Sequence, residues 1–410
     1  MREKMKERGI TLIALVVTII VLLILAGISI AMLTGQNRIL NRAAEAKEKT
    51  RVAQEDENEK LQGYEKIINQ YAENLPIGEE TTPYLPDKEK FEKVEGTDLS
   101  KGLVIKEKKT ESEYVWVEVP RTTAVYPTAG VNISSFTDDE YTKIETDLHT
   151  YTNDYRNGTG NSDTWYNATN DSKEANKSDW YQSESDYNTA KKKMLKSVYQ
   201  NGGFWVGRYE AGIENEVDIR KAASATATLI PVTKQNMYPY NYVTRTQAKV
   251  LAEKVESGSY TSSLMFGVQW DLVLKYIETK NATAQDNLKK NSTQIGNYKD
   301  NLWSITNTNA KYLKIDGNSY TACPNPYAKT SSLSIVLTTG ADTSFSLMNI
   351  YDLAGNVLEW TLEKTSDVSY LCASRGGFYN VSGSDYPAKS RFGSLTSDSY
   401  DNIGFRISIY

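Results

Sequence analysis

The chain has very few of the residues from which soft-metal and nucleophilic sites are built. Its 410 residues include two cysteines, Cys323 and Cys372, and one histidine, His149. A zinc site made of Cys and His, a Cys–His nucleophile pair or a serine triad would therefore have almost no material. The two cysteines could form a disulfide or could be two small buried apolar side chains, because spacing alone does not decide between these alternatives.

The chain also lacks an excess of positive charge. Its formal net charge is −5, and its lysines are interspersed with acidic residues, so no basic stripe for nucleic acid is present. Phenylalanine is scarce (8) while tyrosine is abundant (28). The middle and the end of the chain are rich in Ser, Thr, Asn, Asp and Gly. This composition is typical of the wet, loop-rich surface of an exported protein.

One long apolar run stands out in this polar sequence. From Ile10 to Leu33 there are 24 residues without a charge, about 36 Å as a helix, which would cross a hydrocarbon core of about 30 Å. We therefore predict a transmembrane helix over 10–34, with the basic flank in the cytoplasm and the bulk of the chain outside. A cleaved secretory signal is the alternative, but the run is too long and lacks a small-residue cleavage region.

The start of this run resembles the prepilin start of type IV pilins, carried by Arg8-Gly9-Ile10-Thr11-Leu12-Ile13. The resemblance implies a leader over 1–9, removal by a prepilin peptidase between Gly9 and Ile10, and contacts with other pilin subunits. The family has glutamate at the fifth mature residue, where this chain has Ala14. A plain membrane anchor through 10–33 is therefore the alternative to a fibre subunit. Either way the expected location is the cell membrane, cell surface or pilus, with the C-terminal domain outside.

Hydrophobic periodicity and the positions of the prolines divide the rest of the chain into segments. A polar helical pattern over 35–75 predicts a stalk, and prolines at 76, 83 and 86 predict a linker over 76–87. An α+β domain is expected over 88–410. Its predicted elements are strands at 102–106, 113–120 and 204–209 and helices at 190–199, 244–255 and 268–278. The polar segment 127–188 is interpreted as an insertion, either a solvated excursion or part of a binding rim.

Three blocks near the end carry a family resemblance: a turn holding Asp352, Gly355-Asn356 and Glu359-Trp360, then Arg375-Gly376-Gly377, then Gly404-Phe405-Arg406. Together they resemble the formylglycine-generating-enzyme, or sulfatase-modifying-factor, family. That family is a variant of the C-type lectin fold. Two earlier segments, 204–210 and 264–271, also resemble parts of this family's sequence. The resemblance implies a C-type lectin-like head, here behind a long transmembrane or pilin-like helix. Leu358 stands where the family has tryptophan, and Phe378 where it has serine.

The resemblance also implies a structural calcium ion. Its ligands would be Asp352, the carbonyls of Gly355 and Val357, and Glu359, which is the mixed oxygen set that a hard cation prefers. The alternative is a loop held by hydrogen bonds and salt links alone.

Enzymatic activity is not expected. The family's oxidases bind copper through two cysteines that follow the glycine pair, and the corresponding places here are at about Val381 and Tyr386. Because copper(I) needs soft thiolate donors, we predict neither a copper site nor oxidase chemistry.

The segment between the second and third blocks has an unusual composition. From Arg375 to Asn402, 18 of 28 residues are Gly, Ser, Asn, Asp or Tyr, the types that dominate antibody paratopes. This layout resembles the variable proteins of diversity-generating retroelements, whose adenine-rich codons mutate; loops of any exported protein share the bias. The predicted binding residues are Phe378, Tyr379, Asn380, Ser382, Ser384, Asp385, Tyr386, Ser397, Ser399 and Tyr400.

The sequence therefore predicts a surface-displayed, adhesin-like or receptor-like protein that binds an extracellular protein or glycan. The alternative from another class is a structural pilin subunit without its own ligand. An oxidase-type enzyme is the least favoured.

Overall fold

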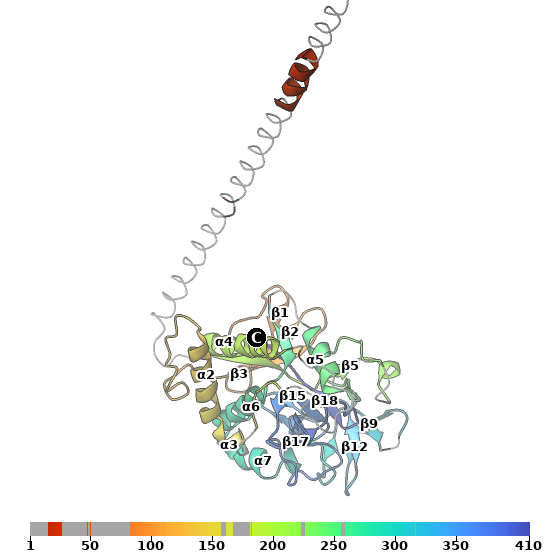
Figure 1. Cartoon of the computed structure of the whole chain (residues 1–410). Helices are drawn as coiled ribbons and strands as arrows, with labels where there is room; N and C mark the ends of the chain where they lie inside the picture. The colour runs from red at the N-terminus through yellow and green to blue at the C-terminus, as the bar shows by residue number, and fades with distance from the viewer. Residues whose placement is uncertain are drawn as a thin grey trace, which may run out of the picture. The chain divides into compact units, whose positions relative to one another are not determined.

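The computed structural model of the chain describes residues 15–26, 47, 50, 83–156, 161–166, 181, 183–222, 226–255, 259–315 and 317–410. The chain divides into two units, Met1–Glu80 and Thr81–Tyr410. The second unit contains every strand named below (Figure 1).

The predicted fold class is right in being α+β and wrong in its long transmembrane helix. In the first unit the described residues 15–26 are helical. Within the described part of the chain no helix is both long and apolar enough to cross a membrane. The prediction rested on the charge-free run, and absence of charge reports hydrophobicity without by itself establishing a membrane-spanning helix.

Several predictions for the N-terminal part fall outside the described residues. These are the leader 1–9, the junction Gly9–Ile10 and the stalk 35–75 except for residues 47 and 50, which are helical. The linker 76–87 is described from residue 83 onward. The folded unit begins at Thr81, a few residues before the predicted start at residue 88.

The larger sheet of the second unit has six antiparallel strands in the order β1-β2-β3-β4-β19-β7. The hairpin of β2 and β3 confirms the strands predicted near 102–106 and 113–120, with Ile105 opposite Tyr114. The C-terminal strand lies between β4 and β7, so the end of the chain completes the interior of this sheet. The bounds are β1 Phe91–Lys93, β2 Val104–Glu107, β3 Glu113–Glu118, β4 Gly203–Gly207, β7 Ser262–Leu264 and β19 Ile407–Ile409.

A second sheet of four strands has the order β17-β16-β15-β18. Its longest strand, β15 (Leu358–Lys364), pairs antiparallel with β16 (Cys372–Arg375) and parallel with β18 (Ile403–Phe405). β17 (Arg391–Ser394) is the edge strand. Both faces of β15 are buried, because Leu358 through Glu363 are all covered. Trp360 is 1% exposed and donates its indole N–H to the carbonyl of Val243 at 2.9 Å.

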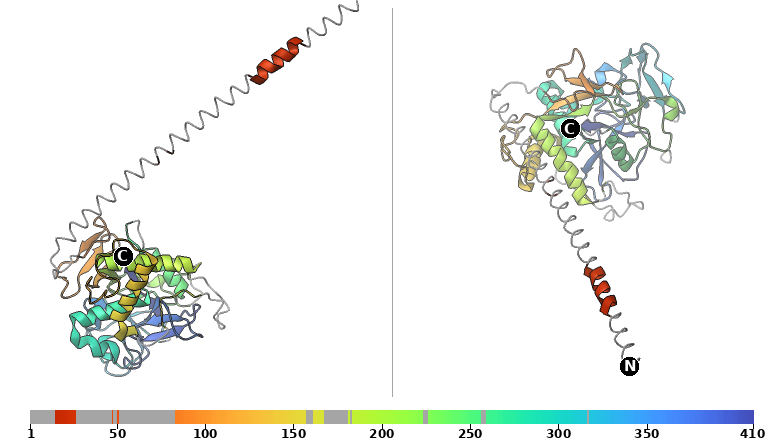
Figure 2. Two further views of the ribbon diagram at one scale, coloured as in Figure 1. Left: turned by 60° about the vertical axis from the view of Figure 1, so that its left-hand side comes forward. Right: turned by 90° about the horizontal axis from the view of Figure 1, so that it is seen from above.

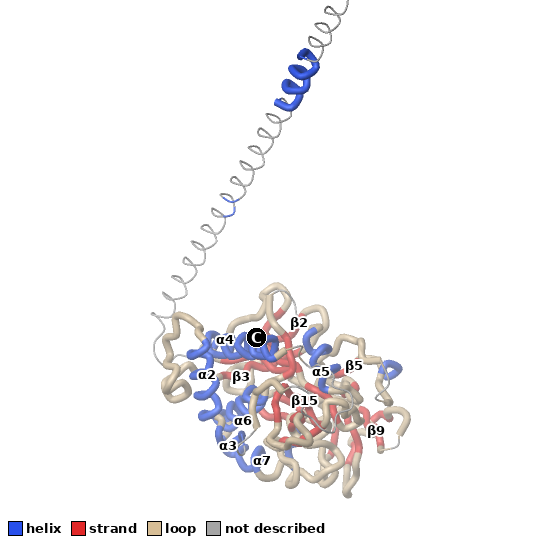
Figure 3. Tube along the Cα trace, in the orientation of Figure 1, coloured by secondary structure: helices blue, strands red, loops and turns tan. Residues whose placement is uncertain are grey.

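The helices start where the sequence supplies caps. Thr137 begins α2 (Asp138–Tyr151) and Thr244 begins α5 (Arg245–Glu253), each with a capping box. α4 (Glu184–Asn201) ends at Gly202, in the left-handed conformation with φ 70°. Figures 1 and 2 show α2 beside α4. In Figure 3 the helices gather on one side of the unit, while loops fill much of the other. The remaining helices are α3 Asn153–Arg156, α6 Gly267–Lys280 and α7 Gln285–Lys289.

Short strands complete the loop-rich side. The three-stranded group β10-β9-β12 packs its own small core around Trp303, Ile305 and Phe345. The bounds are β5 Gly212–Ile213, β6 Tyr238–Pro239, β8 Ser304–Ile305, β9 Lys311–Lys314, β10 Thr321–Ala322, β11 Tyr327–Ala328, β12 Ile335–Leu337, β13 Ser346–Leu347 and β14 Ile350–Tyr351.

The segment 127–188 is more than a surface excursion. Ile144, Leu148 and Tyr155 are fully buried in the main core, and Tyr187 donates its hydroxyl to the carbonyl of Leu362 on β15 at 3.2 Å. The hydrophobic pattern of this segment is weak, because its apolar residues are few and widely spaced among charges. Four-residue spacing on α2 is nevertheless enough to bury one stripe of the helix.

Both cysteines are free thiols and buried, so the disulfide alternative is wrong. The Sγ of Cys372 lies 3.0 Å from the hydroxyl of Tyr166, and burial raises the pKa of the Cys323 thiol to about 11. Since the thiolate is the reactive form, we expect the native protein in non-reducing buffer to react slowly with a thiol reagent. After unfolding without reductant, the same reagent should titrate two thiols per chain. Fewer than two would show that a disulfide forms after all.

Candidate functional site

The tail segment, residues 376–402, starts and ends in buried structure. It leaves β16 through Gly376 and Gly377, both with positive φ (93° and 77°), and returns to β18 on the other side of β15. A Cβ on Gly377 would lie 2.4 Å from the carbonyl oxygen of Tyr386. Only glycine fits there, because the conformation and the close approach both exclude a side chain.

The start of the tail is anchored by a buried network of four charged side chains. Arg375 donates to Asp271 (2.7 Å) and Glu363 (3.0 Å), and Arg391 donates to the other oxygens of the same two carboxylates (2.6 and 2.7 Å). All four are nearly or fully buried. The fixed geometry makes this end of the tail a rigid support.

The ten predicted binding residues do not form one uniform exposed patch. Three classes of burial occur. Asn380, Ser384, Asp385, Ser397 and Tyr400 are exposed; Phe378, Ser382 and Tyr386 are half-buried; Tyr379 and Ser399 are buried. Eight of the ten therefore reach the surface, and the other two support it from below.

Three side chains of the tail, Phe378, Tyr386 and Phe392, form an aromatic row. Phe378 and Tyr386 have ring centroids 6.2 Å apart, and Tyr386 and Phe392 are 5.9 Å apart. Phe392, on the edge strand β17, is 37% exposed and was not among the predicted residues. Strand alternation would not have found it, because Ser394, two residues on and so on the same face of the strand, is buried.

The end of the tail forms part of a pocket that sequence reasoning missed. We call it the Tyr242 pocket, a cavity of about 260 Å³. Only Asp401 of its lining comes from the tail segment; the rest comes from residues 219–221, 239–242 and 313–320. The lining contains the cations Arg220, Lys221 and Lys314, against the single acid Asp401. No motif joins these segments in the sequence, because only the fold brings them together.

Tyr242 is held in an unusual backbone conformation at the wall of this pocket. Its φ is 52°, rare for a bulky residue and more common at functional sites. Its N–H donates to the carbonyl of Tyr400 at 2.9 Å, and its own carbonyl accepts from the Nε of Arg220 at 2.9 Å. The predicted residue Tyr400, 54% exposed, is therefore placed directly beside the pocket.

Buried Tyr379 connects the start of the tail to the pocket wall. Its hydroxyl donates to the Asp401 carboxylate at 2.7 Å, and Asn241 donates to the Asp401 carbonyl at 2.6 Å. Burial, together with Asp401, raises the pKa of Tyr379, so this hydroxyl stays protonated and remains a donor. Tyr379 is thus a positioning residue for the pocket rather than a contact residue.

The residues implied as calcium ligands are arranged differently from a cation site. Both Glu359 oxygens accept from Arg406 (2.6 to 3.1 Å), and Asp352 accepts from the N–H of Gly340 at 2.6 Å. In the described chain, the group of acidic and imidazole ligand atoms close enough to share a metal lies elsewhere. The guanidinium of Arg406 supplies the positive charge that calcium would bring, so these residues do not fit a calcium ion.

A third carboxylate shares this buried space. Glu210 accepts from the Asn356 side chain (2.7 Å) and from the Val357 N–H (3.2 Å). Burial, followed by the charges of Asp352 and Glu359, raises the pKa of Glu210 well above its usual value. Burial likewise raises the pKa of Asp352 to about 7. One guanidinium therefore faces three acids, and part of the excess negative charge is removed by protonation.

Comparison with known proteins gives little. No family model matches the chain, and no curated protein matches it. Treponema denticola variable protein 1 is a solved structure similar to part of it. It shares 13% sequence identity over 50% of this chain and 84% of that chain, with a TM-score of 0.28. That score is too low to show a shared fold, so the likeness to C-type lectins stays a prediction.

We predict that Asp352→Asn flattens the dependence of stability on pH. With its folded pKa raised to about 7, wild-type Asp352 holds a proton that the unfolded chain has lost. The contribution of Asp352 to the free energy of unfolding therefore falls by up to about 4 kcal/mol as pH rises from about 4 to about 7. Urea unfolding measured at pH 5 to 8 should show that the free energy of unfolding of the variant increases relative to that of wild type as pH rises.

Asp385→Asn, which removes an exposed carboxylate, is the matched control for this measurement. Parallel pH curves for wild type and Asp352→Asn would contradict the proposed protonation. Repeating the series with calcium and with a chelator also tests whether calcium binds at these carboxylates. Stabilisation of wild type by calcium, lost in the variant, would show that an ion displaces Arg406 from these carboxylates.

Proposed function

We propose that residues 81–410 form a ligand-binding module, displayed outside the cell, whose binding face is the exposed part of the tail segment together with the Tyr242 pocket. The observation that carries this proposal is the position of Tyr400. An exposed aromatic from the paratope-like tail lies beside a strained, charge-lined pocket built from three other segments. Surfaces that combine tyrosine with Ser, Asn and Gly gain contact area and adaptable hydrogen bonds at low entropic cost.

The size of the pocket favours a macromolecular partner. At about 260 Å³ it is smaller than the roughly 300–1,000 Å³ that encloses a drug-sized molecule. It suits one side chain or one sugar unit of a larger ligand, while the aromatic row and Tyr400 supply the surrounding contacts. The proposed partner is therefore an extracellular protein or glycan. The three cations in the lining favour an anionic group on the part of the ligand that enters the pocket.

The exposed tail residues are also suited to variation, as the resemblance to retroelement variable proteins implies. Residues such as Asn380, Ser384 and Ser397 are exposed, so changing them disturbs little packing. Both ends of the tail are held by buried residues. We propose that the ligand-contacting positions vary on this support. Catalysis is not part of the proposal, because the places of the family's copper ligands hold Val381 and Tyr386.

The proposal is tested by replacing Tyr386 and Tyr400 together with alanine. Labelled full-length protein is applied to arrays of glycans and extracellular-matrix proteins, and the affinity for each bound partner is then measured. Loss of two aromatic anchors should weaken binding by more than about 2 kcal/mol, roughly thirtyfold. The thermal midpoint should change little, since neither side chain is fully buried.

The matched control replaces Tyr141 and Tyr151, two half-buried tyrosines of α2, in the same way. It should bind like wild type. Equal losses in both variants, or no loss in either, would contradict the assigned face. A protein that binds nothing on either array would favour the alternative, a head that only covers a larger structure.

A further inference from the structure

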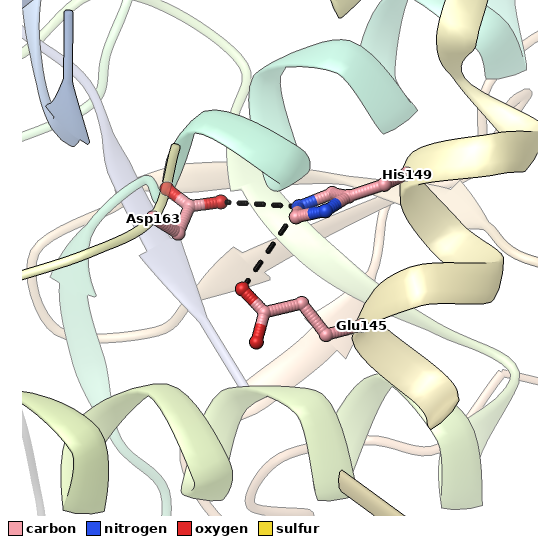
Figure 4. A group of neighbouring side chains, drawn as sticks. All are labelled: Glu145, His149 and Asp163. Atoms are coloured by element: carbon pink, nitrogen blue, oxygen red, sulfur yellow. Dashed lines mark ion pairs between the residues drawn. The ribbon is translucent and has the colours of Figure 1, made fainter. Parts of the chain in front are cut away.

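The single histidine of the chain lies against two carboxylates (Figure 4), and none of the three residues lines the Tyr242 pocket. Glu145 and His149 are four residues apart on α2, so they share one face of the helix. Asp163 approaches from the segment 161–166. The Nε2 of His149 lies 3.8 Å from Asp163 Oδ2 and 4.0 Å from Glu145 Oε1, and the three ligand atoms all lie within 4.8 Å of one another.

These distances are too long for hydrogen bonds, whose donor and acceptor lie about 2.7–3.2 Å apart. The Nε2 atom is buried and has no hydrogen-bond partner among the described residues. A buried polar nitrogen left in this state is costly. Ligands about 2.0–2.2 Å from one tetrahedral zinc ion lie about 3.3–3.6 Å apart. The two carboxylate oxygens would have to move about 0.2–0.7 Å closer to Nε2, and up to about 1.5 Å closer to each other, to reach coordination spacing.

Asp163 is fixed as a metal ligand would be. It is 1% exposed, and its two oxygens accept from the N–H groups of Gly267 (2.6 Å) and Val268 (2.9 Å) at the start of α6. Such outer hydrogen bonds orient ligands in metal sites.

We propose that Glu145, His149 and Asp163 bind one divalent transition-metal ion, of which zinc fits the donor set best. One imidazole and two carboxylates are borderline and hard donors of the kind zinc accepts. Glu145 and His149 are each 21% exposed, so water can reach the ion and complete its coordination. The bound ion would tie α2 to the segment 161–166, and through Asp163 to α6.

Lys191 on α4 is the competitor for this ion. Its Nζ lies 2.9 Å from both oxygens of Glu145 and donates to the carbonyl of Asp163 at 2.8 Å. This ammonium neutralises Glu145 in the metal-free protein and would repel a cation placed beside it. The competing explanation of the cluster is a protonated His149 paired with the two acids, which requires no metal.

The sequence makes the decisive measurement direct, because every imidazole signal comes from His149. Full-length protein, purified without a histidine tag and stripped with a chelator, is titrated with zinc while its imidazole nitrogens are followed by NMR. We expect one zinc per chain, with a change at Nε2 that saturates at one equivalent. Imidazole signals unmoved by zinc in the wild-type protein would overturn the proposal, whatever the variants do.

Variants distinguish zinc coordination by this cluster from simple charge pairing between His149 and the two acids. His149→Ala should weaken zinc binding at least about a hundredfold, and Lys191→Met should strengthen it about tenfold by removing the competing ammonium. Lys192→Met is the matched control, because the neighbouring Lys192 pairs with Asp138 instead, and it should bind like wild type. Unchanged affinity in His149→Ala, or weaker binding in Lys191→Met, would contradict the assigned ligands.

Discussion

The architecture depends on one buried guanidinium, that of Arg406. This residue separates β18 from β19 and so stands where the chain passes from the four-stranded sheet into the six-stranded sheet. It donates to Glu359 on β15, to the carbonyl of Gly207 at the end of β4 and to the carbonyl of Tyr351 on β14. Removing one partner of such a buried pair typically costs about 3–5 kcal/mol, because the other charge stays buried. The two sheets are thus joined by a polar contact inside an apolar core.

The same principle repeats four residues along β15. Glu363 lies four residues beyond Glu359, past an irregularity in the pairing of β15 with β16, and both carboxylates are buried. Glu363 is neutralised by Arg375 and Arg391, as Glu359 is by Arg406. The arginines of the second and third sequence blocks are therefore the partners of the first block's strand. These contacts hold both ends of the tail through buried side chains and not through its exposed residues.

Residue type alone could not separate binding positions from supporting ones. Tyr379 and Tyr400 lie in the same kind of sequence, yet one is 3% exposed and the other 54% exposed. The difference follows from the turn after Gly377 and from the acceptor that Asp401 offers to Tyr379. The grouping of Glu145, His149 and Asp163 was equally hidden, because Asp163 is held beside α2 by contacts with residues distant in the sequence, Lys191 on α4 and the start of α6.

The sequence by itself determined the α+β class, the hairpin of β2 and β3, helices α5 and α6, and the fixed ends of the tail. Periodicity, capping residues and glycines with obligatory conformations are local properties, so they can be read along the chain. Tertiary structure alone decided that Arg406 pairs with Glu359, that both thiols are free, and that Tyr400 lies beside a pocket. Among the described residues it contains no helix that is long and apolar enough to cross a membrane. Each of these depends on which distant residue supplies the compensating charge, acceptor or packing surface, and spacing in the sequence does not encode that choice.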